Sequence, residues 1–442
     1  MEPSLEGAPR RRMSLPTRIL LGLVIGAVVG AVLNLLYAPS LGGEPSPAYV
    51  EVAWWADKVV KPFGTLFLNL LFMVVVPIVF CSLFLGVAGL GSVQKLGSLG
   101  SRTLLWFLGT TGMAAVLGIT LVRVIEPGKN VSPDVVEAIK QQYASTAQAK
   151  IAQSQDAKGW LEMVVDMVPK NVVGAAGDNT KILGLIVFAL ILGAAATRLP
   201  SDRTRVLREL CESLYELCVK VLGWVMEFAP IGVACLIFHA SAKLGFDVMK
   251  LVGWYFVTAM GGLIFYQLVV VTALARVFAG LSPRRFYRGV RTLLITAFST
   301  SSSNATMPTT IRTAVDEFGA PKEIAGFVMP LGATMNMNGT ALFEGVSVLF
   351  LAQVYGKGLS ITEQLLVVGV AVLTAIGAAG VPGGSIPLLA IVLIQVGVPP
   401  EFLALILGVD RLVDMTRTLP NVTSDLVCSL WLSRREGHQL KA

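Results

Sequence analysis

The chain has 442 residues, of which 54% are hydrophobic and only 14% are charged, and it contains 44 glycines. Soluble domains carry about 25% charged residues, so this chain has too few charges to cover the surface of a soluble globule. A disordered chain is excluded too, because it needs the opposite balance. Apolar runs of about 20 residues recur along the sequence and predict an all-α polytopic membrane protein in a lipid bilayer.

Other functional classes are disfavoured by the same sequence. The net charge of +7 does not indicate nucleic-acid binding, because the basic residues lie at the ends of apolar runs and form no stripe with aromatic residues. The five cysteines lie in or beside apolar runs, as small buried side chains do. The two histidines form no Cys/His cluster and no Ser/His constellation, so neither a zinc site nor an intramembrane enzyme is expected.

Eight apolar runs have the length of a membrane-spanning helix. They cover about residues 16–38, 60–90, 103–125, 180–197, 208–238, 250–279, 321–353 and 399–432. Two more runs, 293–320 and 360–396, are broken by polar or Gly/Pro-rich centres. Pro77 and Pro230 lie inside long runs and are expected to kink their helices.

Lys and Arg predict the orientation, because they favour the cytoplasmic side of the membrane. They cluster at Arg10, Arg11, Arg12 and Arg18, at Lys95 and Arg102, at Arg198, Arg203, Arg205 and Arg208, at Arg284, Arg285, Arg288 and Arg291, and at Arg434, Arg435 and Lys441. These clusters share one side only if 293–320 and 360–396 are re-entrant hairpins. The first helix is then retained, both termini are cytoplasmic, and 126–160 forms an outside loop.

Three polar segments interrupt apolar sequence near the C-terminus, where irregular backbone survives only inside protein or facing water. The serine-rich run 299–308 predicts a hairpin tip whose free helix amides attract a carboxylate, with a flexible linker as the alternative. The run 336–340, Asn-Met-Asn-Gly-Thr, predicts an unwound turn whose oxygens suit a small cation, with helix-packing asparagine as the alternative. The glycine-rich run 377–387 predicts a second tip that approaches a ligand closely and hinges as a gate, unless it is an ordinary loop.

The last apolar run carries the most informative pattern. Its polar residues are Asp410, Asp414, Arg417, Thr418, Asn421 and Asp425. At about 100° per residue they fall on one helix face, and charge inside a membrane marks a substrate or ion path by default. Arg417 suits a carboxylate and Asp414 an ammonium group, which together describe an acidic amino acid. Salt bridges that only join helices are the alternative.

Glu344 also lies in an apolar run, one turn after Thr340. A buried carboxyl group is a candidate proton carrier, and a simple glutamate at a helix end is equally consistent with the sequence.

These motifs together resemble the dicarboxylate/amino acid:cation symporter family, which contains glutamate/aspartate and neutral amino-acid carriers. The resemblance covers nearly the whole chain and is carried by MVVVPIVFCSLFLGVAGL (73–90), SSSNATMP, NMNGTALFE, GAAGVPGG and DRLVDMTRTLPNVTSDL (410–426). It implies eight spans, two re-entrant hairpins and inverted repeats. It also implies a homotrimer that moves like an elevator, with the glycine-rich tip as the outer gate.

The resemblance divides the chain into two domains. Residues 1–92 and 129–249 would form a static scaffold, and residues 93–128 and 250–442 a mobile transport domain. The implied substrate site consists of Ser301, Ser302, Ser303, Thr340, Gly380, Val381, Pro382, Gly383, Asp414, Arg417, Thr418 and Asn421. In it Arg417 would bind the side-chain carboxylate, Asp414 the amino group, and Asn421 with the Ser303 region the α-carboxylate.

Three sodium sites follow from the same resemblance, two of them expected and one in question. The first would use Asn336, Asn421, Asp425 and the Gly332 carbonyl. The second would use carbonyls of Thr334, Ala375, Ile376 and Ala378. The third would use Thr110, Thr111, Asn336 and position 338, where the family's usual aspartate is replaced by Asn338, which removes a full negative charge.

Other departures concern the substrate and the proton. Ser301 and Met415 occupy places where many members have a further arginine, and Pro420 is expected to interrupt the last helix. Glu344 stands where proton-coupled animal glutamate carriers have a glutamate, so coupling with fewer sodium ions and a proton is expected. The sequence predicts an importer of L-aspartate or L-glutamate in a bacterial plasma membrane. A C4-dicarboxylate or neutral amino-acid symporter and an anion channel are the alternatives.

Overall fold

The computed structural model describes residues 13–37, 46–93, 98–129, 165, 168–177, 182–377, 380 and 382–441. In these ranges the chain forms helices and no strands, which confirms the all-α fold. The basic residues 10–12, Lys95, Ala378, Val381 and most of the predicted outside loop 126–160 lie outside the described residues.

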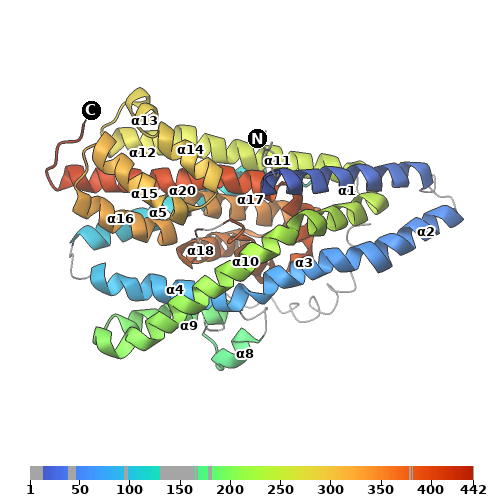
Figure 1. Ribbon diagram of the computed structural model, residues 1–442, viewed down its shortest axis with the longest axis horizontal. Coiled ribbons are helices and arrows are strands. Elements are labelled where there is room, and N and C mark those ends of the chain that lie inside the picture. The colour runs from blue at the N-terminus through green and yellow to red at the C-terminus, as the bar shows by residue number, and fades with distance from the viewer. Residues whose placement is uncertain are drawn as a thin grey trace, which may run out of the picture.

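One group of helices packs around the long helix α10 (Ser201–Leu244). α1 (Leu15–Tyr37) runs along α10, and the pieces of the second apolar run lie on another side of it (Figure 1). Those pieces are α2 (Pro47–Trp55), the π-helix η1 (Ala56–Val60), α3 (Lys61–Met73) and α4 (Val75–Val93). α9 (Ile182–Ala196) packs against α4, and the short α8 (Val172–Ala176) packs against α9.

A second group is built around α17 (Asn338–Val354) and α20 (Leu407–Arg435), which pack together. Every residue of α17 except Gln353 is buried, as expected of a helix at the centre of a bundle. The helices around this pair are α5 (Ser98–Ile125), α11 (Asp247–Phe265), η4 (Tyr266–Val271), α12 (Thr272–Val277), α13 (Pro283–Gly289), α16 (Lys322–Met335) and η6 (Pro400–Leu405).

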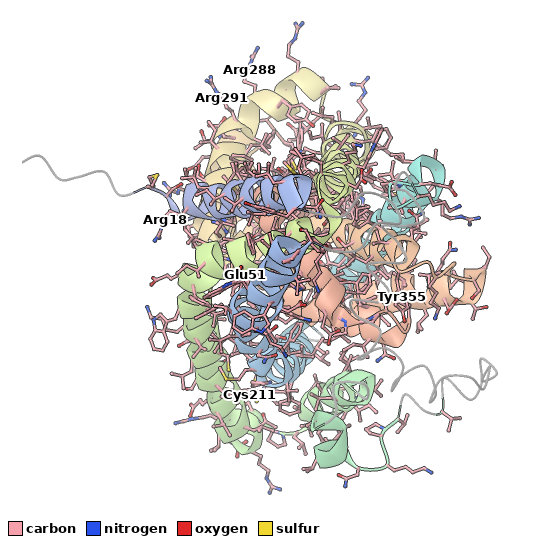
Figure 2. All side chains as sticks on the ribbon, turned by 90° about the vertical axis from the view of Figure 1, so that its right-hand side faces the viewer. Arg18, Glu51, Cys211, Arg288, Arg291 and Tyr355 are labelled. Atoms are coloured by element: carbon pink, nitrogen blue, oxygen red, sulfur yellow. The ribbon has the colours of Figure 1, made fainter. Side chains whose placement is uncertain are left out.

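Both broken runs fold back on themselves as helical hairpins. Hairpin 1 consists of α14 (Arg291–Thr300) and α15 (Ser303–Arg312), which continues as η5 (Thr313–Glu317). Hairpin 2 consists of α18 (Ile361–Gly377) and α19 (Ile386–Gln395). At the base of hairpin 1, Arg288 and Arg291 extend away from the molecule at one edge (Figure 2), which suits a position near lipid headgroups.

Six helical segments of the described chain are long and apolar enough to cross a membrane. They are Thr17–Tyr37, Pro47–Gly89, Leu99–Ile125, Ser201–Lys243, Asp247–Val277 and Lys322–Val354. α9 is shorter, and α20 is long enough but carries the polar stripe. The chain is therefore a multi-pass membrane protein, and the count of eight spans stays a prediction.

The prolines act differently from one another. Pro77 has no N–H to offer Met73, and the break between α3 and α4 lies at Val74, as the expected kink requires. Pro230 and Pro420 are accommodated inside the continuous helices α10 and α20. The predicted interruption of the last helix at Pro420 is therefore wrong. The second apolar run also begins earlier than residue 60, since Ser46 caps a helix that starts at Pro47.

Three glycines set how closely α1 approaches α10. Gly22, Gly26 and Gly30 recur every fourth residue, and a β-carbon at any of them would overlap the α10 backbone. Small residues at this spacing let two membrane helices approach closely.

We expect Gly26→Ala to lower the thermal midpoint of the purified protein by several degrees. A β-carbon there meets the Ala234 carbonyl, and such overpacking costs about 1–3 kcal/mol. Gly261→Ala on α11 is the matched control, because a β-carbon there meets nothing within 4 Å. Equal midpoints for both variants would contradict close α1–α10 contact.

Candidate functional site

The polar stripe of α20 meets both hairpin tips and the break between α16 and α17. Together they line a small cavity of about 10 Å³, which is room for about one water molecule. Its lining consists of Ser301, Ser303, Met337, Thr340, Gly380, Ser385, Asp414, Arg417, Thr418 and Asn421. Eight of these were predicted from the sequence, and Met337 and Ser385 are additions. Of the other predicted residues, Ser302, Pro382 and Gly383 do not line the cavity, and Val381 lies outside the described residues.

The stripe of α20 faces the protein interior. Asp410, Asp414, Arg417, Thr418, Asn421 and Asp425 are all at most 5% exposed. Charged groups so deeply buried need partners, because water no longer solvates them. The partners come from α20 itself and from the elements packed against it.

Arg417 and Asp414 form the central ion pair. Arg417 donates from Nη2 and Nε to Asp414 Oδ1, at 2.7 and 3.0 Å. Its Nη1 lies 3.9 Å from Asp410 Oδ1, which is beyond a hydrogen bond, and neither atom has another hydrogen-bond partner among the described residues. The sequence predicted that Arg417 binds a ligand carboxylate and Asp414 a ligand ammonium group. In the structure the two side chains bind each other.

Two neighbours of this pair were missed at the sequence level. Arg411 donates to Asp414 Oδ2 at 3.3 Å, so two guanidinium groups share one carboxylate. The three-residue spacing between Arg411 and Asp414 is a helix ion-pair spacing that the sequence already contained. Phe343 lies under the Arg417 guanidinium at 4.6 Å, where a ring face stabilises a cation, but no local pattern joins α17 to α20.

The hairpin tips close the cavity by binding each other and α20. At the first tip Ser301 adopts a left-handed conformation (φ 50°), and the Ser302 hydroxyl caps α15 by accepting from the Ala305 N–H. The same hydroxyl donates to the Gly380 carbonyl of the second tip at 2.5 Å. Gly383 in turn donates its N–H to Asp414 Oδ2 at 3.0 Å. One carboxylate thus holds the second tip as well as Arg417.

The helix break predicted at 336–340 is confirmed. α16 ends at Met335, α17 begins at Asn338, and Asn336 and Met337 have non-helical backbone angles. Gly339 lies so close to the Arg417 carbonyl that a β-carbon would overlap it, and its N–H donates to Asn421 Oδ1 at 2.7 Å. The absence of a side chain at Gly339 therefore lets the unwound segment dock on α20.

A second polar cluster lies behind this break. Asn336 donates to Asp425 Oδ1 at 2.7 Å and accepts from the Thr110 hydroxyl at 3.1 Å, while Thr111 donates to Asn338 Oδ1 at 2.9 Å. A β-carbon at Gly332 would overlap the Asp425 carboxylate. Most of the residues predicted for the first and third cation sites thus lie together, and they offer the oxygen atoms that hard cations prefer. Asn338 Nδ2 is buried with no hydrogen-bond partner among the described residues.

The residues predicted for the remaining sites lie in three helices near this cluster. Thr334 belongs to α16, and Ala375 and Ile376 belong to α18, which packs against α16. Glu344 is fully buried in α17 and accepts from the Thr374 hydroxyl of α18 at 2.8 Å. Its second oxygen, Oε1, has no partner in the described chain.

A multi-pass membrane protein with a buried polar site between two hairpin tips and an unwound helix belongs to the class of secondary transporters. The sequence matches the model of the sodium:dicarboxylate symporter family over residues 15–435. The chain belongs to that family, and it is a transporter and not an enzyme.

Similar proteins are found with different substrates in their names. A proton/glutamate-aspartate symporter of Escherichia coli is 33% identical over 96% of this chain and 93% of its own length. A proton/sodium-glutamate symport protein of Bacillus subtilis is 34% identical over 97% and 94%. The neutral amino acid transporter B(0) of Mus musculus is 31% identical over 94% and 80%. Identity alone therefore does not separate acidic from neutral substrates.

We expect Ser302→Ala to loosen the second hairpin tip, because it removes the hydroxyl that joins both tips. Losing a hydrogen bond of about 0.5–1.5 kcal/mol makes opening several-fold more frequent. Hydrogen–deuterium exchange over residues 382–386 measures this, with the exposed Ser299→Ala as the control. Unchanged exchange in Ser302→Ala would show that Ser302 does not hold the tips together.

Proposed function

We propose that this protein imports L-aspartate or L-glutamate together with sodium ions, and with a proton carried on Glu344. The observation that carries the proposal is the buried Arg417–Asp414 pair at the meeting point of the two hairpin tips. An acidic amino acid bears a carboxylate for Arg417 and an ammonium group for Asp414, so it replaces one internal ion pair with two new ones.

Charge balance favours this substrate over its competitors. A neutral amino acid supplies no side-chain carboxylate and leaves Arg417 without its partner. A C4-dicarboxylate supplies no ammonium group and leaves Asp414 with Arg411, at 3.3 Å, in place of the closer Arg417. An unpaired buried charge costs about 3–5 kcal/mol, which is a factor of about a hundred to a thousand or more in affinity.

The polar cluster around Asp425 supports sodium as the coupling ion. Its oxygens belong to α5, α16, α17 and α20, and Asn421 of the substrate cavity lies one turn from Asp425 on α20. A cation at Asp425 would therefore change the position of α20 and of the break between α16 and α17, both of which line the substrate cavity. Asn338 provides no negative charge, so the third site would bind sodium more weakly than the first and second.

Glu344 supports a proton as a further coupling ion. It lies fully buried between α17 and α18 with a single hydroxyl partner and no cation in hydrogen-bond contact. A bare carboxylate is costly in such a place, so the group would cross the membrane with its proton and release it where water reaches it.

The movement and assembly of the protein are also part of the proposal. The packing of α1–α4, α9 and α10 as one group, and of α5 and α11–α20 as another, supports a static scaffold and a mobile elevator domain. We place it as a homotrimer in a bacterial plasma membrane with both termini cytoplasmic, and hairpin 2 serves as the outer gate.

In proteoliposomes, we expect uptake of radiolabelled aspartate or glutamate to require an inward sodium gradient. An inward proton gradient should raise the rate further, and Glu344→Gln should lose only this proton component. Uptake indifferent to both gradients would remove symport and favour an anion channel.

We expect Arg417→Cys to lower acidic amino-acid uptake by about a hundredfold to a thousandfold, because the side-chain carboxylate loses its partner. Neutral amino-acid uptake should rise in the same variant, since the buried cation is gone. Arg435→Cys, an exposed arginine on the same helix, is the control. Unchanged acidic uptake in Arg417→Cys would show that another group selects the substrate.

A further inference from the structure

The π-helix η4 lies in the middle of the span formed by α11 and α12 and joins three other elements. Tyr266 donates its hydroxyl to the Thr110 carbonyl of α5 at 3.1 Å. Gln267 accepts from the Thr423 hydroxyl of α20 at 2.9 Å, and its backbone carbonyl accepts from the Tyr287 hydroxyl of α13 at 2.8 Å. π-helical turns inside α-helices are rare and are frequent at functional sites.

The Tyr266 contact reaches the proposed cation cluster through one residue. The Thr110 carbonyl accepts the bond from Tyr266. The Thr110 hydroxyl lies 2.8 Å from the Trp106 carbonyl of its own helix and 3.1 Å from Asn336 Oδ1. Tyr266 is fully buried and is not one of the residues that line the substrate cavity. Its phenol therefore fixes the height and rotation of the α5 turn that presents Thr110 to Asn336.

The π-helix also takes part in a second contact, between the Gln267 carbonyl and the Tyr287 hydroxyl. The Gln267 carbonyl within the π-helix accepts from the Tyr287 hydroxyl, which ties the same turn to the helix that leads into hairpin 1. Gln267 Nε2 is buried beside α20 without a partner in the described chain, so only the accepting end of this side chain is used. Neither the Tyr266 contact nor the Gln267 contacts involve a charged group, so η4 acts on its neighbours by fixing their positions.

We infer that Tyr266 is a positioning residue for sodium binding, holding the α5 turn so that the Thr110 hydroxyl lies at the cation cluster. The inference rests on the proposed sodium coupling. It assigns to the sixth apolar run a role that the sequence motifs did not contain, since no polar motif marks residues 266–271.

The test measures the sodium concentration that gives half-maximal uptake in proteoliposomes made with the full-length protein. Tyr266→Phe keeps the ring and removes the hydroxyl. We expect the half-maximal concentration to rise about two- to tenfold, the factor for one neutral hydrogen bond, while the maximal rate at saturating sodium stays near wild type. A merely structural role would lower the rate at every sodium concentration.

The control is Tyr255→Phe, a fully buried tyrosine of α11 whose hydroxyl pairs with Ser347 of α17 at 2.9 Å, away from Thr110. Its half-maximal sodium concentration should match wild type. If Tyr266 acts through Thr110, then Tyr266→Phe adds no further change to a Thr110→Ala background.

The outcomes separate the two claims. Wild-type uptake that ignores sodium overturns the proposed coupling, and the inference falls with it. Sodium-dependent wild-type uptake with an unchanged half-maximal concentration in Tyr266→Phe overturns the inference alone. Fully additive effects of Tyr266→Phe and Thr110→Ala overturn the route through Thr110.

Discussion

The buried pair of Arg417 and Asp414 is the interaction on which the centre of this protein depends. Two charges inside a membrane protein must satisfy each other or a ligand, and here the same aspartate also holds the second hairpin tip through Gly383. The bonding of the Asp414 carboxylate is thus linked to the position of the second hairpin tip. Under the proposed function, a ligand that draws Asp414 away from Arg417 would also disturb the bond from Gly383 to Asp414, and so would link ligand binding to the position of the second hairpin tip.

Close backbone approach is what allows so many polar groups to converge. Gly339 brings the break between α16 and α17 onto α20, and Gly332 makes room for the Asp425 carboxylate. The unwound turn then leaves oxygens available at membrane depth, where an unpartnered backbone would be costly. The cavity and the polar cluster around Asp425 share α20 and this break. Under the proposed function, a ligand in one would change the geometry of the other, and this shared wall would couple ion to substrate.

Similarity to relatives sets the class of protein but not its substrate, because carriers named for acidic and for neutral amino acids match this chain at nearly the same identity. In the proposed function, the Arg417 guanidinium and its surroundings make this distinction. Arg417 has a carboxylate on one side and the face of Phe343 on the other, so the cation is stabilised before a ligand arrives. A second guanidinium, that of Arg411, adds positive charge at the same carboxylate.

The sequence by itself determined the helical membrane fold, both hairpins, the break at Asn336–Met337 and the buried stripe of α20, because apolar length and helical period are local properties. It placed eight of the ten residues that line the cavity. It did not determine that Phe343 lies under Arg417, that Thr374 donates to Glu344, or that Tyr266 reaches Thr110, since these contacts join different helices. The Arg417–Asp414 pair has a three-residue spacing that the sequence did contain, but only the packing around α20 shows that the two bind each other. The expected interruption at Pro420 was wrong because tertiary packing overrides local propensity. α20 is buried along most of its length and stays continuous where a proline alone would break a helix.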